Sequence, residues 1–69
     1  MADTVYKKID VVGTSQMNLE DAIQNAIARS GETVRNMSWF EVDEIRGRIE
    51  EGNVTQWQVT VRIGFAVGE

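Results

Sequence analysis

The chain contains neither cysteine nor histidine among its 69 residues. The first absence excludes disulfides and thiolate metal sites, and the second removes the commonest metal ligand and the readiest general base near neutral pH. A chain of this length forms a single domain, over 1–69, and buries only about 60% of the surface that its unfolded form exposes. Because it has no covalent or metal staple, we expect its stability to depend on oligomerisation or on a ligand.

Basic residues and long apolar runs are also scarce. The sequence has 11 Asp and Glu residues against 7 Lys and Arg residues, a net charge of −4. Nonspecific nucleic-acid binding needs clustered Lys and Arg, and here they are scattered. No apolar run approaches the roughly 20 residues of a membrane span, and the start Met1–Thr4 lacks the features of a secretory signal. We therefore expect a cytoplasmic protein with no nucleic-acid or membrane partner.

The first half of the chain predicts one strand followed by one helix. Residues 4–12 are β-branched and roughly alternating, which is typical of a strand, and a turn is expected at 13–15. Asn18 is a suitable N-cap residue. From Leu19 to Val34 the apolar side chains recur at helical spacing, which predicts one amphipathic helix of about 18 residues.

The second half predicts two long strands, 37–49 and 54–67, joined by a turn at 51–53. The apolar alternation of the first changes phase, which a β-bulge near Asp43–Glu44 repairs. The predicted fold is α+β in the order β-α-β-β, a three-stranded antiparallel sheet wrapped around one helix. The long strands extend beyond the helix, so we expect them to pack against neighbouring subunits.

The alternation places Trp39, with its large indole side chain, on a polar strand face. An isolated monomer seldom leaves an indole there uncovered. The residues alone favour an anchor at a subunit interface, and the alternative is a stacking platform for a planar ligand. Trp57 belongs to the apolar face of its strand and is expected in the core.

Arg46 and Gln58 are expected on the same face as Trp39. Arginine can hold a phosphate or carboxylate, and a glutamine amide can bind a ring edge that carries carbonyl and N–H groups. Together, the indole of Trp39, the amide of Gln58 and the guanidinium of Arg46 would suit a nucleotide-like aromatic cofactor. A solvated glutamine and a surface ion pair explain the same two residues more simply.

Two further polar groups have simple explanations. A phosphate site could be flanked by Tyr6, Arg29, Thr33 and Arg35, although solvated side chains are the explanation we prefer. A hard cation could be held by Glu41, Asp43 and Glu44, although we expect only a negatively charged rim and no metal site. No nucleophile with a base partner can be named, so any reaction would have to be the chemistry of a bound cofactor, and we expect no enzyme.

The order and spacing of several short motifs resemble those of the dodecins, small flavin-binding proteins that assemble as hollow spheres of twelve subunits. The resemblance extends from about Val5 to Val67. The motifs are Val5-Tyr6-Lys7-Lys8, Val12-Gly13-Thr14-Ser15, Ala22-Ile23, Ala26-Ile27-Ala28-Arg29, Thr33-Val34-Arg35-Asn36, Trp39-Phe40-Glu41-Val42, Ile45-Arg46-Gly47, Gln58-Val59 and Gly64-Phe65.

The resemblance implies storage and protective sequestration of a flavin, FMN or riboflavin, in a homododecamer. Trp39 would stack on the isoalloxazine ring and quench it, with two flavins held between the Trp residues of two-fold-related subunits. Gln58 would hydrogen-bond the polar edge of the ring, and Arg46 would approach the phosphate of FMN. The alternative function is a structural or interaction oligomer in which Trp39 is only an interface anchor.

The resemblance also implies possible coenzyme A binding, with Arg29, Thr33 and Arg35 as candidate contacts. One position departs from the family pattern. Bacterial dodecins usually carry a basic residue directly after Gly-Phe, and this chain has Ala66 there. The choice between FMN and riboflavin is therefore left open.

Overall fold

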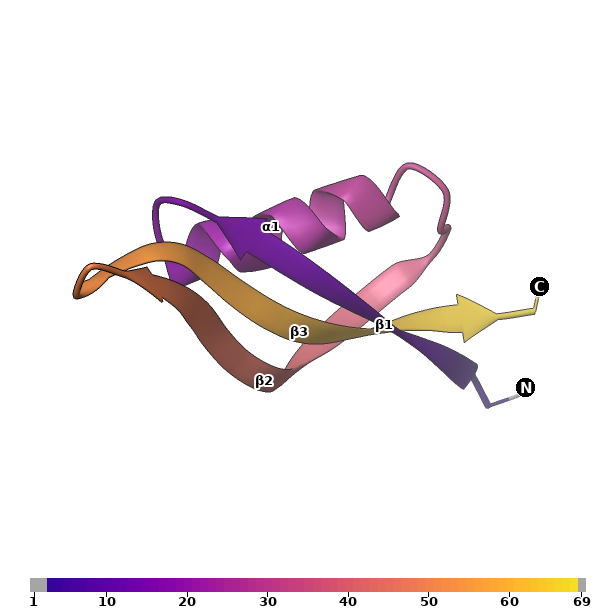
Figure 1. The fold of residues 1–69 in the computed structure, drawn as a ribbon. Coiled ribbons are helices and arrows are strands. Elements are labelled where there is room, and N and C mark those ends of the chain that lie inside the picture. The colour runs from indigo at the N-terminus through magenta and orange to yellow at the C-terminus, as the bar shows by residue number, and fades with distance from the viewer. Residues whose placement is uncertain (1–2, 69) are drawn as a thin grey trace.

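The computed structural model describes residues 3–68, so Met1 and Ala2, which the argument against a secretory signal used, lie outside the described residues. The described residues form β1 (Val5–Ser15), α1 (Leu19–Ser30), β2 (Met37–Glu50) and β3 (Asn53–Val67). The strands form one antiparallel sheet in the order β1-β3-β2, and α1 lies along one side of it (Figure 1). This confirms the predicted fold. Within residues 3–68, no helix has both the length and the apolarity of a membrane span.

The core lies between α1 and the central strand β3. Val59, Val61 and Ile63 alternate along β3 and are fully buried, and Ala22 and Ala26 are buried on the facing side of α1. Complete burial of a Val or Ile side chain contributes about 1.5–3 kcal/mol. The two alanines bring the helix backbone close to the sheet. We refer to this side of the sheet as the inner face and to the opposite side as the outer face.

β1 extends further than the sequence predicted. Gly13 pairs with Val59 and Ser15 with Trp57, so the residues expected to form a turn are the last three of the strand. A Cβ on Gly13 would collide with the carbonyl oxygen of Ala22 and lie 2.8 Å from the Cβ of Ala26. The glycine is therefore needed for close packing against α1, and it does not break the strand.

α1 begins where predicted and ends earlier. The side chain of Asn18 accepts a hydrogen bond of 2.7 Å from the backbone N–H of Asp21, which confirms the N-cap. The helix has 12 residues, not about 18, because Gly31 caps it and the amides of Glu32 and Thr33 bond to carbonyls three residues earlier. Such bonds tighten the last turn and end the helix.

β2 contains the predicted β-bulge. Its register against β3 shifts between Val42 and Glu44, and two further shifts occur near its ends. A bulge increases bending, and Figure 1 shows β2 bent near its middle with its concave side toward α1. A two-residue turn joins β2 to β3, with positive φ at both Glu51 (52°) and Gly52 (81°). This is the backbone pattern of a type I′ hairpin.

The helix leaves the inner face of β2 uncovered. Phe40, Val42, Ile45 and Ile49 are 40–72% exposed. Trp57 was expected in the core but is only half-buried, because it lies beyond the helix, with Ile45 and Ile49, around a hollow of about 240 Å³. The subunit is also elongated, measuring 56 × 20 × 13 Å, with a radius of gyration of 14.4 Å. A compact domain of this length would have about 11 Å.

The close approach at Gly13 can be tested by Gly13→Ala. The added methyl group must displace the α1 backbone, and overpacking of this kind typically costs 1–3 kcal/mol. We expect a loss of stability of about this size in denaturant unfolding at fixed protein concentration. Thr14→Ala, on the exposed neighbouring residue, serves as the control and should change stability by less than about 0.5 kcal/mol. Equal effects of the two substitutions would contradict the packing described here.

Candidate functional site

Trp39 lies on the outer face of the sheet. It pairs across the strands with Gly64, while its neighbour Phe40 pairs with the buried Ile63, so the two aromatic side chains occupy opposite faces. The residue is 38% exposed. The expectation that the indole is on the polar face, away from the helix, is therefore confirmed.

The indole lies directly over Gly64. A Cβ built on this glycine would be nearly equidistant from Cε2, Cζ2 and Cη2 of Trp39 and far inside contact distance. A point that lies equally close to three consecutive ring atoms is above the face of the ring. One face of the indole therefore rests on the β3 backbone, and the other faces outward.

Tyr6 completes an aromatic pair with Trp39. The ring centroids are 5.7 Å apart and the planes are tilted by 60°. Tyr6 comes from β1 and pairs with Ala66, so the two rings approach each other from the strands on either side of β3. Small residues at 64 and 66 leave the space for this approach. Tilted pairs at this separation are favourable.

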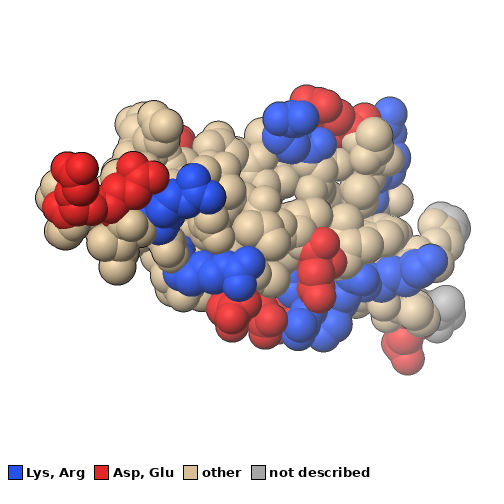
Figure 2. All heavy atoms as spheres, viewed as in Figure 1, with Lys and Arg blue, Asp and Glu red and all other residues tan. Residues whose placement is uncertain are grey.

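A charge cluster lies next to the indole on the outer face. Arg62, only 30% exposed, contacts Asp10 through Nε (2.9 Å), Glu41 through Nη1 (3.6 Å) and Asp43 through Nη2 (3.6 Å). Lys8 also contacts Glu41, at 3.6 Å. Figure 2 shows oppositely charged side chains intermixed along this part of the surface. Because Arg62 already serves three carboxylates, its guanidinium is not free to bind a phosphate.

The surroundings of Arg62 favour its charged form. The hydrogen bond to Asp10, together with the attraction of Asp10, Asp43 and Glu41, raises the pKa of Arg62 above its ordinary value, and partial desolvation opposes the shift. Because the pKa is raised, the charged guanidinium of Arg62 stabilises the folded state fully at any pH below the ordinary pKa of arginine. This stabilisation is lost only as the pH rises through the folded-state value.

Arg46 and Gln58 form a second polar group on the outer face. They are cross-strand partners, and Nε of Arg46 donates to Oε1 of Gln58 at 3.1 Å. Arg46 also lies near Glu44, with Nη1 3.8 Å from Oε1. The amide of Gln58 donates to Gln56 at 2.8 Å, which leaves one amide proton available. The side chain of Arg46 is 57% exposed.

The structure brings Arg46 and Gln58 together but does not bring either of them to Trp39 within one subunit. Gly64, beneath the indole, and Gln58 are six residues apart on β3. Roughly 20 Å of extended strand separates such positions, at ~3.3 Å per residue. β2 also bends with its convex side outward, so the two groups occupy separate arms of the surface (Figure 1). One ring could reach both groups only if they came from different subunits.

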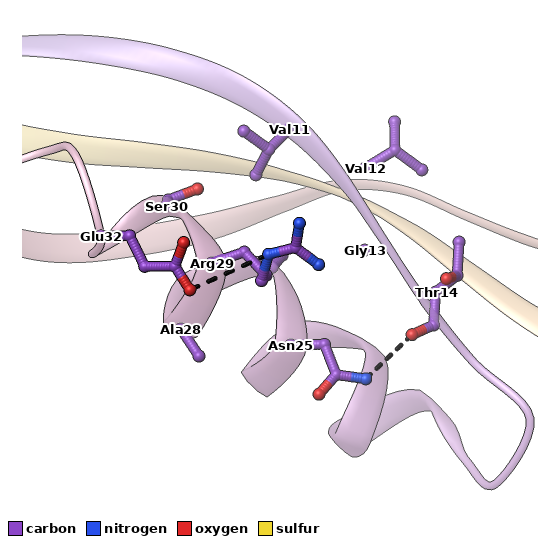
Figure 3. Close-up of a pocket in the computed structure, with 10 residues that line it drawn as sticks. Val11, Val12, Gly13, Thr14, Asn25, Ala28, Arg29, Ser30 and Glu32 are labelled. Carbon is purple, nitrogen blue, oxygen red and sulfur yellow. Dashed lines mark hydrogen bonds and ion pairs between the residues drawn. The ribbon is translucent and has the colours of Figure 1, made fainter.

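Arg29 lines a hollow of about 600 Å³ between β1 and α1, on the other side of the molecule from the indole. Figure 3 shows it beside Glu32, to which it is weakly paired, and shows Asn25 donating to the carbonyl of Thr14. Thr33 and Arg35 follow the helix end, do not line this hollow, and are exposed. Binding of coenzyme A by Arg29, Thr33 and Arg35 stays a prediction.

Tyr6 was considered as a fourth residue around a phosphate, together with Arg29. The structure contradicts that grouping. Tyr6 pairs with Ala66 on the outer face and contacts Trp39, whereas Arg29 belongs to α1 on the inner face. The alternation of β1 fixes this arrangement, because odd-numbered residues such as Ile9 and Val11 pack toward the helix.

The acidic residues expected to give a negatively charged rim are engaged in ion pairs. Glu41 and Asp43 contact Arg62, and Glu44 contacts Arg46. Over residues 3–68, no three Asp or Glu side chains are grouped so that they could hold a metal ion.

The alternation of the last strand places Gly64 and Arg62 on this face, but sequence reasoning gave neither residue a role. The signal for Gly64 was available, because a glycine in a long alternating strand often marks a close approach by another group. The three partners of Arg62 come from two other strands, Asp10 from β1 and Glu41 and Asp43 from β2. Their convergence depends on the register across both strand pairs and could not be read from local spacing.

The chain was compared with known proteins. The family model for dodecin matches residues 5–68. Dodecin from Thermus thermophilus is 52% identical over 65 residues, which are 94% of this chain and 94% of that protein. A crystal structure from T. thermophilus has a TM-score of 0.91 at 51% identity, covering 97% of this chain and 98% of the other. Dodecin from Streptomyces davaonensis has a TM-score of 0.92 at 41% identity, covering 99% and 100%.

These matches define the fold class, that of a small α+β protein with one helix on a three-stranded antiparallel sheet. The chain belongs to the dodecin family. The resemblance inferred from the sequence is therefore confirmed at the level of family and fold.

The charge cluster can be tested by Arg62→Gln. The change leaves three neighbouring carboxylates without their shared cation, so we expect a lower unfolding temperature at low ionic strength. Because about 1 M salt shortens the Debye length to about 3 Å, the difference from the unmodified protein should shrink there. Arg48→Gln, on a residue outside the cluster, is the control and should have a smaller effect. A destabilisation by Arg62→Gln that is independent of salt would argue against an electrostatic role.

Proposed function

We propose that this protein binds a flavin, either FMN or riboflavin, by stacking the isoalloxazine ring on the outward face of Trp39. The role is storage and sequestration, not catalysis. The observation that carries this proposal is an indole held flat on the outer face of the sheet, with one of its faces open. Membership of the dodecin family supports it.

The residues present fit a flavin. A flat aromatic face suits the isoalloxazine ring, and the remaining amide proton of Gln58 suits a ring carbonyl. The exposed side chain of Arg46, whose guanidinium is only loosely paired with Glu44, suits the phosphate of FMN. When bound, a flavin supplies a ring whose blue-light excitation can be quenched by electron donation from a nearby indole.

The separation of the two polar groups supports a site shared between subunits. Trp39 of one subunit and the Arg46–Gln58 pair of another could contact one ring, whereas a single subunit offers them on separate arms. The uncovered inner face of β2 and the elongated shape also support assembly. We propose a closed homo-oligomer, the homododecamer implied by the family resemblance, because closed symmetry buries repeated surfaces without forming fibres.

The stacking role of Trp39 can be tested by titrating riboflavin and FMN with the unmodified protein, Trp39→Ala and Trp57→Phe. We expect strong quenching of flavin emission by the unmodified protein and by Trp57→Phe. Trp39→Ala should weaken binding at least about tenfold, because loss of a central aromatic contact removes 1.4 kcal/mol or more. Unchanged flavin emission at micromolar unmodified protein would contradict the proposal.

The same variants distinguish the alternative in which Trp39 is only an interface anchor. On a sizing column, a flavin platform predicts that Trp39→Ala elutes as the same oligomer as the unmodified protein, without flavin. An interface anchor predicts dissociation into smaller species. Intact assembly with full flavin affinity would contradict both functions of the indole.

The role of Arg46 can be tested by comparing two ligands that differ in one phosphate. Because a charge-assisted hydrogen bond contributes about 1.5–3 kcal/mol, Arg46→Ala should weaken FMN binding by roughly tenfold or more. Riboflavin, which has no phosphate, should be affected less. Arg48→Ala is the matched control. Equal losses for FMN and riboflavin with Arg46→Ala would mean that Arg46 does not contact the phosphate.

A further inference from the structure

The indole of Trp39 packs against Gly64 and Tyr6, and none of the proposed ligand contacts explains these two residues. We propose that Gly64 and Tyr6 are positioning residues that fix the plane of Trp39, and thereby determine whether a flat ligand can stack on it. The inference rests on the flavin-binding function proposed above, and it concerns residues that would touch the indole and not the ligand.

Gly64 fixes the height of the ring above the sheet. The position that a Cβ would take is overlapped by Cε2, Cζ2 and Cη2 of Trp39, so the benzo ring lies against the backbone of β3. Any side chain at this position would lift the indole or turn it to another rotamer. Glycine is therefore required by the contact with the ring and not by backbone conformation, since Gly64 does not have a positive φ.

Tyr6 limits the tilt of the ring. Its phenol contacts Trp39 at a centroid separation of 5.7 Å and an interplanar angle of 60°. The contact crosses β3 above Ala66 and Gly64, from β1 to β2. The indole therefore has the β3 backbone beneath it and a phenol ring beside it, and these two contacts restrict both of its side-chain torsions.

A fixed plane matters because stacking depends on parallel overlap. An indole free to rotate would present its plane to a ligand only part of the time. Binding would then be weaker, because fixing the side chain in one orientation costs free energy. On the outer face near Trp39, the charged side chains of Arg62 and Glu41 pair with each other at 3.6 Å. The geometry points to Gly64 and Tyr6 as the residues that hold the platform flat.

The coupling between Gly64 and Trp39 can be measured without any flavin. Gly64→Ala should lower the unfolding temperature when Trp39 is present, because the methyl group and the ring compete for one volume. The same substitution in a Trp39→Ala background should have no destabilising effect, since alanine is tolerated in a strand. Equal effects of Gly64→Ala in the two backgrounds would overturn the proposed contact.

A second readout follows the indole itself. In a Trp57→Phe background, Trp39 is the only indole, and its near-ultraviolet circular dichroism reports how firmly it is held. Tyr6→Ala and Gly64→Ala should each reduce this signal, while Tyr6→Phe should retain it because the ring contact is kept. An unchanged signal in Tyr6→Ala would overturn the role of Tyr6.

Riboflavin titration then tests whether the contacts of Gly64 and Tyr6 with Trp39 affect ligand binding. We expect Gly64→Ala to weaken riboflavin binding roughly tenfold or more, and Tyr6→Ala by roughly three- to tenfold, with Tyr6→Phe close to the unmodified protein. Affinities unchanged in both Gly64→Ala and Tyr6→Ala would overturn the inference. If the unmodified protein binds no riboflavin, the proposed function fails instead. The unfolding and dichroism experiments still decide whether Gly64 and Tyr6 position Trp39.

Discussion

A short helix packed on a long sheet is the constraint on which the rest of the structure depends. The alanines of α1 lie on β3 and against Gly13 of β1, which places the helix over two strands and not over the third. The contact is close because the side chains involved are small. Its consequence is that the inner face of β2 and the whole outer face have no cover within the subunit.

Two surfaces with different character result from this arrangement. The inner face of β2 is aliphatic and aromatic, which suits contact with another protein subunit. The outer face has a single flat indole beside a nearly neutralised group of charges and, further along, an exposed arginine paired with a glutamine. Such a surface suits a ligand with a planar ring and a polar tail better than it suits a hydrophobic partner.

Much of this arrangement could be predicted from the sequence, because alternation and turn residues are local signals. The parity of Trp39, the phase change near Glu44 and the cap at Asn18 are each confirmed. The strand end at Ser15 could not be predicted, because it depends on the packing of Gly13 against α1. The helix end at Ser30 has a local signal in Gly31, which the apolar spacing beyond it concealed. Gly13 appeared to be a turn residue until the position of α1 was known. Trp57 was wrongly expected in the core, since it pairs with Ser15 at the end of β1, before α1 begins at Leu19, and is only half-buried.

The central claim is that a flat ligand stacks on the outward face of Trp39. The most direct measurement is the absorption spectrum of riboflavin mixed with the unmodified protein, compared with the sum of the separate spectra. Stacking against an electron-rich indole predicts a shift of the flavin bands to longer wavelength with a weak added shoulder, and Trp39→Ala should abolish both. A spectrum equal to the sum of its components at saturating protein would contradict the account.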